Sequence, residues 1–152
     1  MEKWTEDHRL LQDLMKQEAD LMEQLLKNLH QEETFLLNKT LSHLASLLEE
    51  KNKLLSALNH VRQRQKIVIK ALQSTSSFTL PPLETLFPQK DERVWEVFTL
   101  KEQISSLLDK INLQINRNEL LSQCEKQPQH LPNKKKSKLS VMILPPKNDE
   151  TA

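Results

Sequence analysis

The sequence predicts an all-α protein: an elongated antiparallel helical hairpin or three-helix bundle, with coiled-coil-like packing and a flexible C-terminal tail. The chain of 152 residues contains no glycine, the residue that most readily supplies the positive φ angles of tight turns. Aromatic residues make up 4% of the chain and charged residues 28%, a balance typical of long helices. Two long segments also lack proline, and their apolar residues recur every three or four positions.

Proline and polar residues divide the chain into a helical part and a tail. We expect residues 1–126 to form the bundle, with a helical segment over 5–72, a proline-containing linker over 73–90 and a second helical segment over 91–126. Residues 127–152 combine further prolines with a run of lysines, so they are expected to form the tail.

The first helical segment carries a wide apolar face. Thr5 is its expected N-cap, and Asp91 is the expected N-cap of the second segment, because acidic residues follow both. Two neighbouring registers make up the face: Met15, Ala19, Met22, Leu26, Leu29, Glu33 and Leu36, with Leu11, Leu14, Leu21 and Leu25. A face this wide predicts packing against more than one neighbour.

The apolar pattern of the first segment changes phase near its middle. From residue 37 it continues one residue out of phase, through Leu37, Leu41, Leu44, Leu48, Lys51, Leu55 and Leu58. Such a slip predicts a bend or a break, which we place at residues 38–40. Because neither glycine nor proline stands there, one bent helix and two separate helices both stay open.

Helix lengths favour a chain that folds back at this slip. At 1.5 Å per residue, residues 5–72 would span about 100 Å and residues 91–126 about 54 Å. The second helix would then cover only about half of the first, and the uncovered half must fold back, dimerise or bind a partner. We favour folding back, which produces three helices, and leave monomer and homodimer open.

No arrangement of residues indicates an enzyme or a metal centre. The absence of glycine excludes P-loops, the Rossmann fingerprint and the nucleophile elbow. We expect the scattered histidines on the solvated helix surface, and the acidic pairs Glu32–Glu33 and Glu49–Glu50 on a solvated flank. The single cysteine, Cys124, is expected to be a small helix residue. The sequence therefore predicts no catalytic residue, no cofactor and no metal.

Two polar residues stand at stripe positions. Lys51 lies within a leucine-rich stretch, and the simpler interpretation is that its stem packs while its amine extends into solvent. The alternative is that Lys51 sets the register between helices. Asn118 lies on the stripe of the second segment, where an amide can specify pairing at a cost in stability.

The tail joins a basic run to an apolar one. Its sequence contains Lys134, Lys135, Lys136 and Lys138, then Leu139-Ser140-Val141-Met142-Ile143-Leu144, then Pro145-Pro146. No aromatic residue stands beside the lysines, so nucleic acid is not an expected partner. An apolar, β-prone segment is an aggregation hazard unless it is used or covered, so recognition of a protein is the favoured role.

Part of the leucine pattern is shared with a known family. An early acidic residue, a leucine ladder and an E-K-x-x-L-L stretch are carried here by Glu33, Leu36, Leu44, Leu47, Glu50-Lys51 and Leu54-Leu55. With these residues, the stretch from Leu29 to Leu58 resembles the FlgN-type flagellar and type III secretion export chaperones. Residues 115–121, which run from Ile115 through three polar residues and Glu119 to Leu120-Leu121, resemble the asparagine-rich, Leu-Leu-ending part of the family's later helix.

The resemblance implies a cytoplasmic export chaperone. Such a protein binds a flagellar substrate of the hook-filament junction (hook-associated) type, or a type III secretion substrate, and prevents its premature assembly. Components of the export gate or of the export ATPase are further implied partners. The family engages its client largely through the C-terminal part, which implies these partner-binding residues: Leu120, Leu121, Leu139, Val141, Met142, Ile143 and Leu144.

A structural coiled-coil stalk of a secretion ATPase or export apparatus is the alternative. It shares the length, the composition and the helical hairpin, but it should have a more uniform heptad pattern and no apolar tail. The phase slip and residues 139–144 therefore favour the chaperone. The N-terminus has no apolar signal-peptide core, and no apolar stretch approaches the roughly 20 residues of a membrane span, so we expect a cytoplasmic protein.

Overall fold

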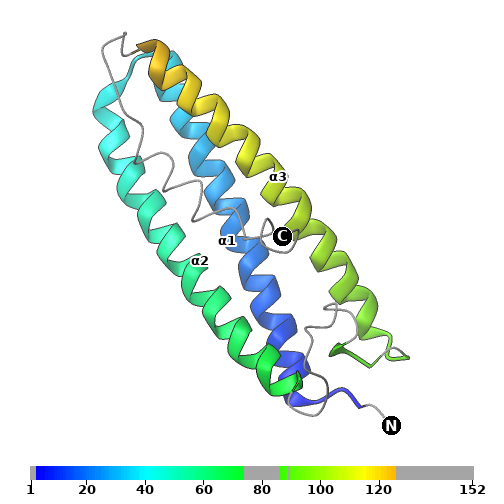
Figure 1. Ribbon diagram of the computed structural model, residues 1–152. Coiled ribbons are helices and arrows are strands. Elements are labelled where there is room, and N and C mark those ends of the chain that lie inside the picture. The colour runs from blue at the N-terminus through cyan, green and yellow to red at the C-terminus, as the bar shows by residue number, and fades with distance from the viewer. Residues whose placement is uncertain (1–2, 74–85, 89, 126–152) are drawn as a thin grey trace, which may run out of the picture.

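The described part of the chain is a bundle of three long α-helices. The computed structural model describes residues 3–73, 86–88 and 90–125. Its elements are α1 (Glu6–Leu37), the short 3-10 helix η1 (Leu41–His43), α2 (Leu44–Gln73) and α3 (Arg93–Glu125). α1 packs closely against both α2 and α3, which approach each other much less (Figure 1). The all-α bundle predicted from the sequence is confirmed, in its three-helix form.

α1 begins with a capping box that uses a histidine. Thr5 is the N-cap, as predicted, and its hydroxyl accepts the backbone N–H of His8 at 3.4 Å. In return, Nδ1 of His8 accepts the backbone N–H of Thr5 at 2.9 Å, a role usually held by glutamate or glutamine. These bonds satisfy amides that the first helical turn leaves without partners. His8 is buried here, so the prediction of solvated histidines is wrong for this residue.

α1 ends in a Schellman motif that contains no glycine. The N–H of Thr40 bonds to the carbonyl of Phe35 at 2.9 Å, and the N–H of Lys39 bonds to the carbonyl of Leu36 at 3.3 Å. The motif requires one residue in the left-handed region, which is Lys39 with φ 56°. The chain therefore breaks into two helices at the residues where the apolar pattern slips.

The break changes which leucines are buried. The stripe predicted along one helix includes Leu37, Leu41 and Leu48, but each of these is more than half exposed. This part of the prediction is wrong, because residues that would share one face of a continuous helix no longer share a face after the chain reverses. α2 instead buries a narrower set: Leu47, Lys51, Leu54, Leu55, Leu58, Val61 and Val68.

Asp91 closes the start of α3. Its carboxylate accepts the backbone N–H of Arg93 at 2.9 Å, although the helix itself begins only at Arg93. The guanidinium of Arg93 donates to the same carboxylate at 2.9 Å and 2.7 Å. The side-chain and backbone hydrogen bonds from Arg93 lower the pKa of Asp91 from 3.8 to about 2. The predicted N-cap, Asp91, thus lies two residues before the observed helix start at Arg93, although its carboxylate does accept the backbone N–H of that residue.

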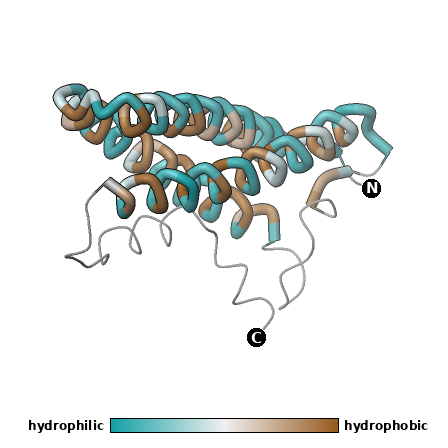
Figure 2. Tube along the Cα trace, turned by 90° about the horizontal axis from the view of Figure 1, so that it is seen from above, coloured by the Kyte–Doolittle hydropathy of each residue, from teal (hydrophilic) through white to brown (hydrophobic). Residues whose placement is uncertain are grey.

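The core runs along the length of α1, whose wide apolar face serves both neighbours as predicted. Its fully buried side chains include Leu11, Leu14, Met22, Leu25 and Leu29 from α1, Leu58 from α2, and Val97 and Ile111 from α3. Each helix carries both apolar and polar residues along its trace (Figure 2), and no helix among the described residues is long and apolar enough to cross a membrane. Most of the predicted linker, and the predicted tail over 127–152, lie outside the described residues.

Candidate partner-binding end of the bundle

One end of the bundle brings together the turn between α1 and α2 and the C-terminal end of α3 (Figure 1). We call it the hairpin end and define it by residues 28–51 and 110–125. It contains Leu120 and Leu121, the two predicted partner-binding residues that the structure describes. The remaining predicted partner-binding residues, over 139–144, lie outside the described part of the chain.

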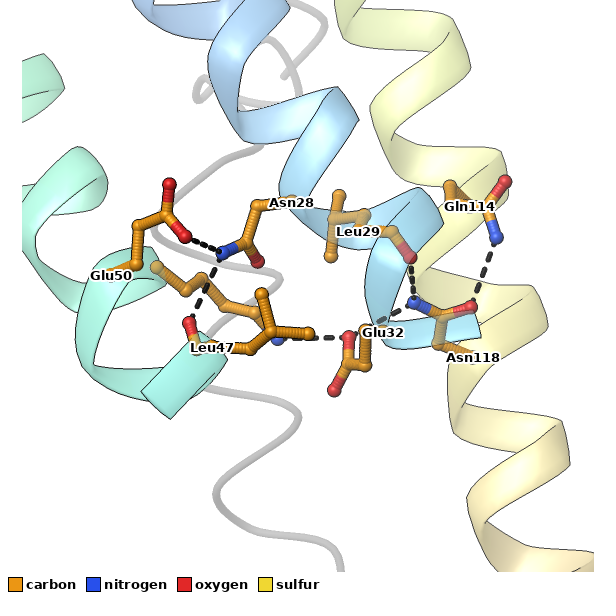
Figure 3. A network of polar contacts seen from close by, with 8 residues as sticks. Asn28, Leu29, Glu32, Leu47, Glu50, Gln114 and Asn118 are labelled. Carbon is orange, nitrogen blue, oxygen red and sulfur yellow. Dashed lines mark hydrogen bonds and ion pairs between the residues drawn. The ribbon is translucent and has the colours of Figure 1, made fainter. Parts of the chain in front are cut away.

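A single carboxylate oxygen joins all three helices at the hairpin end. Oε1 of Glu32 in α1 accepts a hydrogen bond from Nζ of Lys51 in α2 at 3.0 Å, and one from Nδ2 of Asn118 in α3 at 2.9 Å (Figure 3). The amide of Asn118 also donates to the backbone carbonyl of Leu29 at 2.9 Å. Lys51 is 4% exposed and Asn118 is 5% exposed. We call Glu32, Lys51 and Asn118 the polar layer.

The polar layer corrects two predictions. The amine of Lys51 does not extend into solvent, because its side chain is 5% exposed and pairs with Glu32. Glu32 and Glu33 are half-buried and do not lie on a solvated flank. Glu32 and Glu33 are covered because α1 has two neighbours and little free flank, whereas Lys51 is covered because its face of α2 is turned toward Glu32 of α1. Since a buried ammonium without its carboxylate is costly, the pair favours one register of α2 along α1.

Further polar contacts tie α3 to α1 beside the polar layer. Nε2 of Gln114 donates to Oε1 of Glu33 at 2.8 Å and to Oδ1 of Asn118 at 2.9 Å. Nε of Arg117 pairs with the other oxygen of Glu33 at 2.8 Å, although its side chain is largely exposed. The asparagine predicted to specify pairing, Asn118, therefore stands inside a network that fixes α3 against α1.

A second set of contacts ties α2 to α1. Asn28 is buried, and its Nδ2 donates to the backbone carbonyl of Leu47 at 3.1 Å and to Oε1 of Glu50 at 3.4 Å (Figure 3). Within the described structure its Oδ1 has no hydrogen-bond partner. An unpaired buried amide oxygen costs free energy, so this site is a weak point of the α1–α2 contact.

Five leucines of the hairpin end are strongly exposed, and we call them the hairpin-end leucines: Leu37, Leu41, Leu48, Leu113 and Leu120. Leu113 is 70% exposed and Leu120 is 64% exposed, and their seven-residue spacing places them on one face of α3. Leu121 is half-buried. The sequence prediction named Leu120 and did not name Leu113, although both are exposed.

An open pocket of about 310 Å³ lies on the hairpin end where α1, η1 and α2 meet. Its lining consists of Gln31, Thr34, Phe35, His43, Ser46 and Leu47. The rings of Phe35 and His43 stack beside each other with centroids 5.0 Å apart. An open pocket with an aromatic wall suits a side chain of a protein partner better than a fully enclosed small molecule.

The opposite end is closed by an aromatic cluster. Phe87, which is 1% exposed, lies 5.3 Å from the ring of Trp4 and 5.3 Å from the ring of His8. Nε2 of His8 donates to the carbonyl of Leu86 at 2.7 Å, since Nδ1 is the acceptor in the capping box. The guanidinium of Arg93 stacks over Trp4 at 4.5 Å. Residues 86–88 are thereby anchored to the starts of α1 and α3.

Metal-binding chemistry has no candidate in the part of the chain that the structure describes. There, no group of three or more His, Cys, Asp or Glu side chains is placed to hold a metal ion. Cys124 is an exposed free thiol next to the last residue of α3.

No match to this chain was found among profiles of known protein families, curated proteins or solved structures. The resemblance of residues 29–58 and 115–121 to export chaperones therefore stays a prediction.

Proposed function

We propose that this protein is an export chaperone, which holds a helical segment of a flagellar hook-associated or type III secretion substrate and prevents its premature assembly. The observation that carries the proposal is the grouping of five exposed leucines at the end where a charged polar layer interrupts the apolar core. Exposed leucines grouped on one part of a surface are typical of sites that associate with another protein.

The exposed leucines suit an amphipathic helix as client. A client helix presents apolar residues every three or four positions, and Leu113 and Leu120 offer the same helical spacing on α3. The pocket beside Phe35 and His43 adds a place for one client side chain. Helix-on-helix contact of this kind needs no catalytic group, in agreement with the expectation of a protein that is not an enzyme.

The polar layer would also ease a rearrangement at this end. Water can replace the hydrogen bonds of Glu32, Lys51 and Asn118 when the helices separate, whereas an apolar layer gains nothing from water. Replacing a buried ion pair by well-packed apolar side chains of similar volume is often neutral, or stabilising by about 1–4 kcal/mol. Because the polar layer lies beside the exposed leucines, we place the exchange of the bundle's own contacts for those of a client at the hairpin end.

A coiled-coil stalk of a secretion ATPase is the competing function. A stalk is expected to be a long two-helix coiled coil in which each helix has one neighbour and a uniform heptad. α1 has two neighbours instead, and this feature favours the chaperone.

Co-expression with candidate secreted substrates tests the proposal. We expect one substrate to form a stoichiometric complex with the full chain, which gel filtration would detect. Changing Leu41, Leu48 and Leu120 together to Gln should weaken that complex about tenfold or more, because each leucine loses the apolar area that it buries against the client.

The matched control changes Leu10 and Ile67, exposed apolar residues outside the hairpin end, to Gln. Both variants should keep the helix content of the unmodified protein by circular dichroism. If no secreted substrate binds while a secretion ATPase does, the proposed chaperone function is wrong and the stalk function is favoured. If the control weakens the complex as much as the leucine variant does, the hairpin end is not the client site.

A further inference from the structure

We propose that residues 139–144 of the same chain, Leu-Ser-Val-Met-Ile-Leu, cover the hairpin-end leucines when no partner is bound. The inference rests on the proposed function only in that the same leucines would receive the client. Docking of the tail can be measured without any client.

α3 ends at the hairpin end. Glu125 is its last residue, and Cys124 beside it is exposed there. The 27 residues from 126 to 152 therefore follow a helix whose last turn lies next to the exposed leucines.

The length of chain between α3 and the apolar segment limits where the segment can bind. About 14 residue steps separate Glu125 from Leu139, and a chain of that length spans at most about 46 Å. α3 has 33 residues and is about 50 Å long, so the opposite end of the bundle lies at or beyond this limit. Closing a short loop also costs less entropy than stretching the same segment to its full length. The hairpin-end leucines are therefore the exposed apolar residues that the segment reaches most easily.

Charge is compatible with this placement of the tail. Lys134, Lys135, Lys136 and Lys138 come directly before the apolar segment. Glu49 and Glu50 are exposed on α2 next to Leu48, one of the hairpin-end leucines. A tail whose apolar residues lie on Leu48 brings its lysines near these two carboxylates, which adds a favourable charge interaction.

The tether raises the local concentration of the segment. A segment attached by a short linker is present at millimolar effective concentration near its site. Six residues with five apolar side chains need only weak intrinsic affinity to occupy the leucines under those conditions. Weak binding also lets a client displace the segment, so the tail would protect the surface from self-association and yield it to a substrate.

The experiment uses the full chain with one nitroxide label and Met142 as the reporter. The four methionines are labelled with 13C at the methyl group, and Met142 is assigned from the spectrum of Met142→Leu. In a Cys124→Ser background, the label is attached either at Ser42→Cys, next to Leu41, or at Lys66→Cys, farther along α2. Lys66 lies 22 residues past the start of α2, or about 33 Å along that helix.

We expect the label at position 42 to abolish the Met142 signal and the label at position 66 to leave it. Adding Leu41→Gln and Leu48→Gln to the Ser42→Cys protein should restore the signal. Equal attenuation of the Met142 signal by the two labels would overturn the inference. So would a Met142 signal that has the same intensity, with the label at position 42, whether or not Leu41 and Leu48 are changed to Gln. Client binding is measured separately, in the co-expression test. If a client binds there but the free protein shows no docking of the tail, the inference is refuted and the proposed function stands.

Discussion

The two ends of the bundle differ in the side chains that join the helices there. At one end, the buried ring of Phe87 contacts Trp4 and His8 at the start of α1, and the guanidinium of Arg93 from α3 stacks over Trp4. At the hairpin end, the carboxylate of Glu32 holds Lys51 of α2 and Asn118 of α3. Polar contacts between helices also occur outside the hairpin end, where Arg62 pairs with the buried Glu18 at 3.0 Å. The difference between the ends therefore lies in the aromatic cluster at one of them and in the polar layer with its exposed leucines at the other.

The distribution of exposed leucines follows the same division. Leu37 and Leu41 border the reversal of the chain, and Leu48, Leu113 and Leu120 lie within a few turns of it. Away from the hairpin end, Trp4 is half-buried against Phe87, and the exposed large apolar residues among those described are Leu10, Ile67 and Trp95. The aromatic cluster and most of the exposed leucines thus lie at different ends of the same three helices.

The largest effect is expected from Phe87→Ala. Removal of a fully buried phenyl ring should lower the free energy of unfolding by about 3–5 kcal/mol, because the ring loses its apolar contacts and leaves a cavity. Urea denaturation measures this loss. Trp95→Ala is the matched control, since Trp95 is 68% exposed and its removal should cost far less. Equal losses for the two variants would contradict the view that Phe87 closes this end.

A smaller loss, of about 2–3 kcal/mol, is expected from Glu32→Ala. The change leaves the ammonium of Lys51 buried without its carboxylate and removes one acceptor of Asn118. Because the side chain of Glu32 is 24% exposed, the loss should stay below that of a fully buried pair. Urea denaturation again gives the value.

The double variant Glu32→Leu with Lys51→Met sharpens this prediction. It removes both charges and keeps most of the volume, so its stability should lie within about 1 kcal/mol of the unmodified protein or above it. Glu49→Ala, at an exposed acid two residues before Lys51, should change little. A double variant less stable than Glu32→Ala would show that the polar layer contributes more than apolar packing at this end.

The smallest effect concerns acid and Asp91. Its pKa is lowered from 3.8 to about 2 in the folded protein, so its contribution to stability is present above pH 3.8 and is lost as the pH falls toward 2. Asp91→Asn should therefore lower the melting temperature slightly at neutral pH and reduce its decline between pH 4 and about pH 2. Arg93→Gln, which removes the guanidinium partner, should reproduce most of this change. An identical acid profile for Asp91→Asn and the unmodified protein would refute the assignment.

The sequence by itself determined the helices and the approximate positions of the boundaries between them. Apolar residues three or four apart predict helices because such residues lie on one face of a helix. Thr5 is the cap of α1, and the chain breaks at residues 38–40, as the sequence indicated. Asp91 bonds to the first residue of α3. The width of the apolar face of α1 also indicated two neighbours. What the pattern could not decide was whether a chain without glycine bends or breaks, and a left-handed Lys39 settled it.

Only the tertiary structure decided which side chains beside the apolar stripes are buried and which leucines are exposed. Lys51 and Asn118 meet Glu32 from positions 19 and 86 residues away, so no periodicity along the chain can place them on one oxygen. Glu32 and Glu33 have the same local pattern as Glu49 and Glu50, and their burial differs because α1 has two neighbours. Exposure of the hairpin-end leucines likewise depends on where a partner helix ends, which is a property of packing between distant segments.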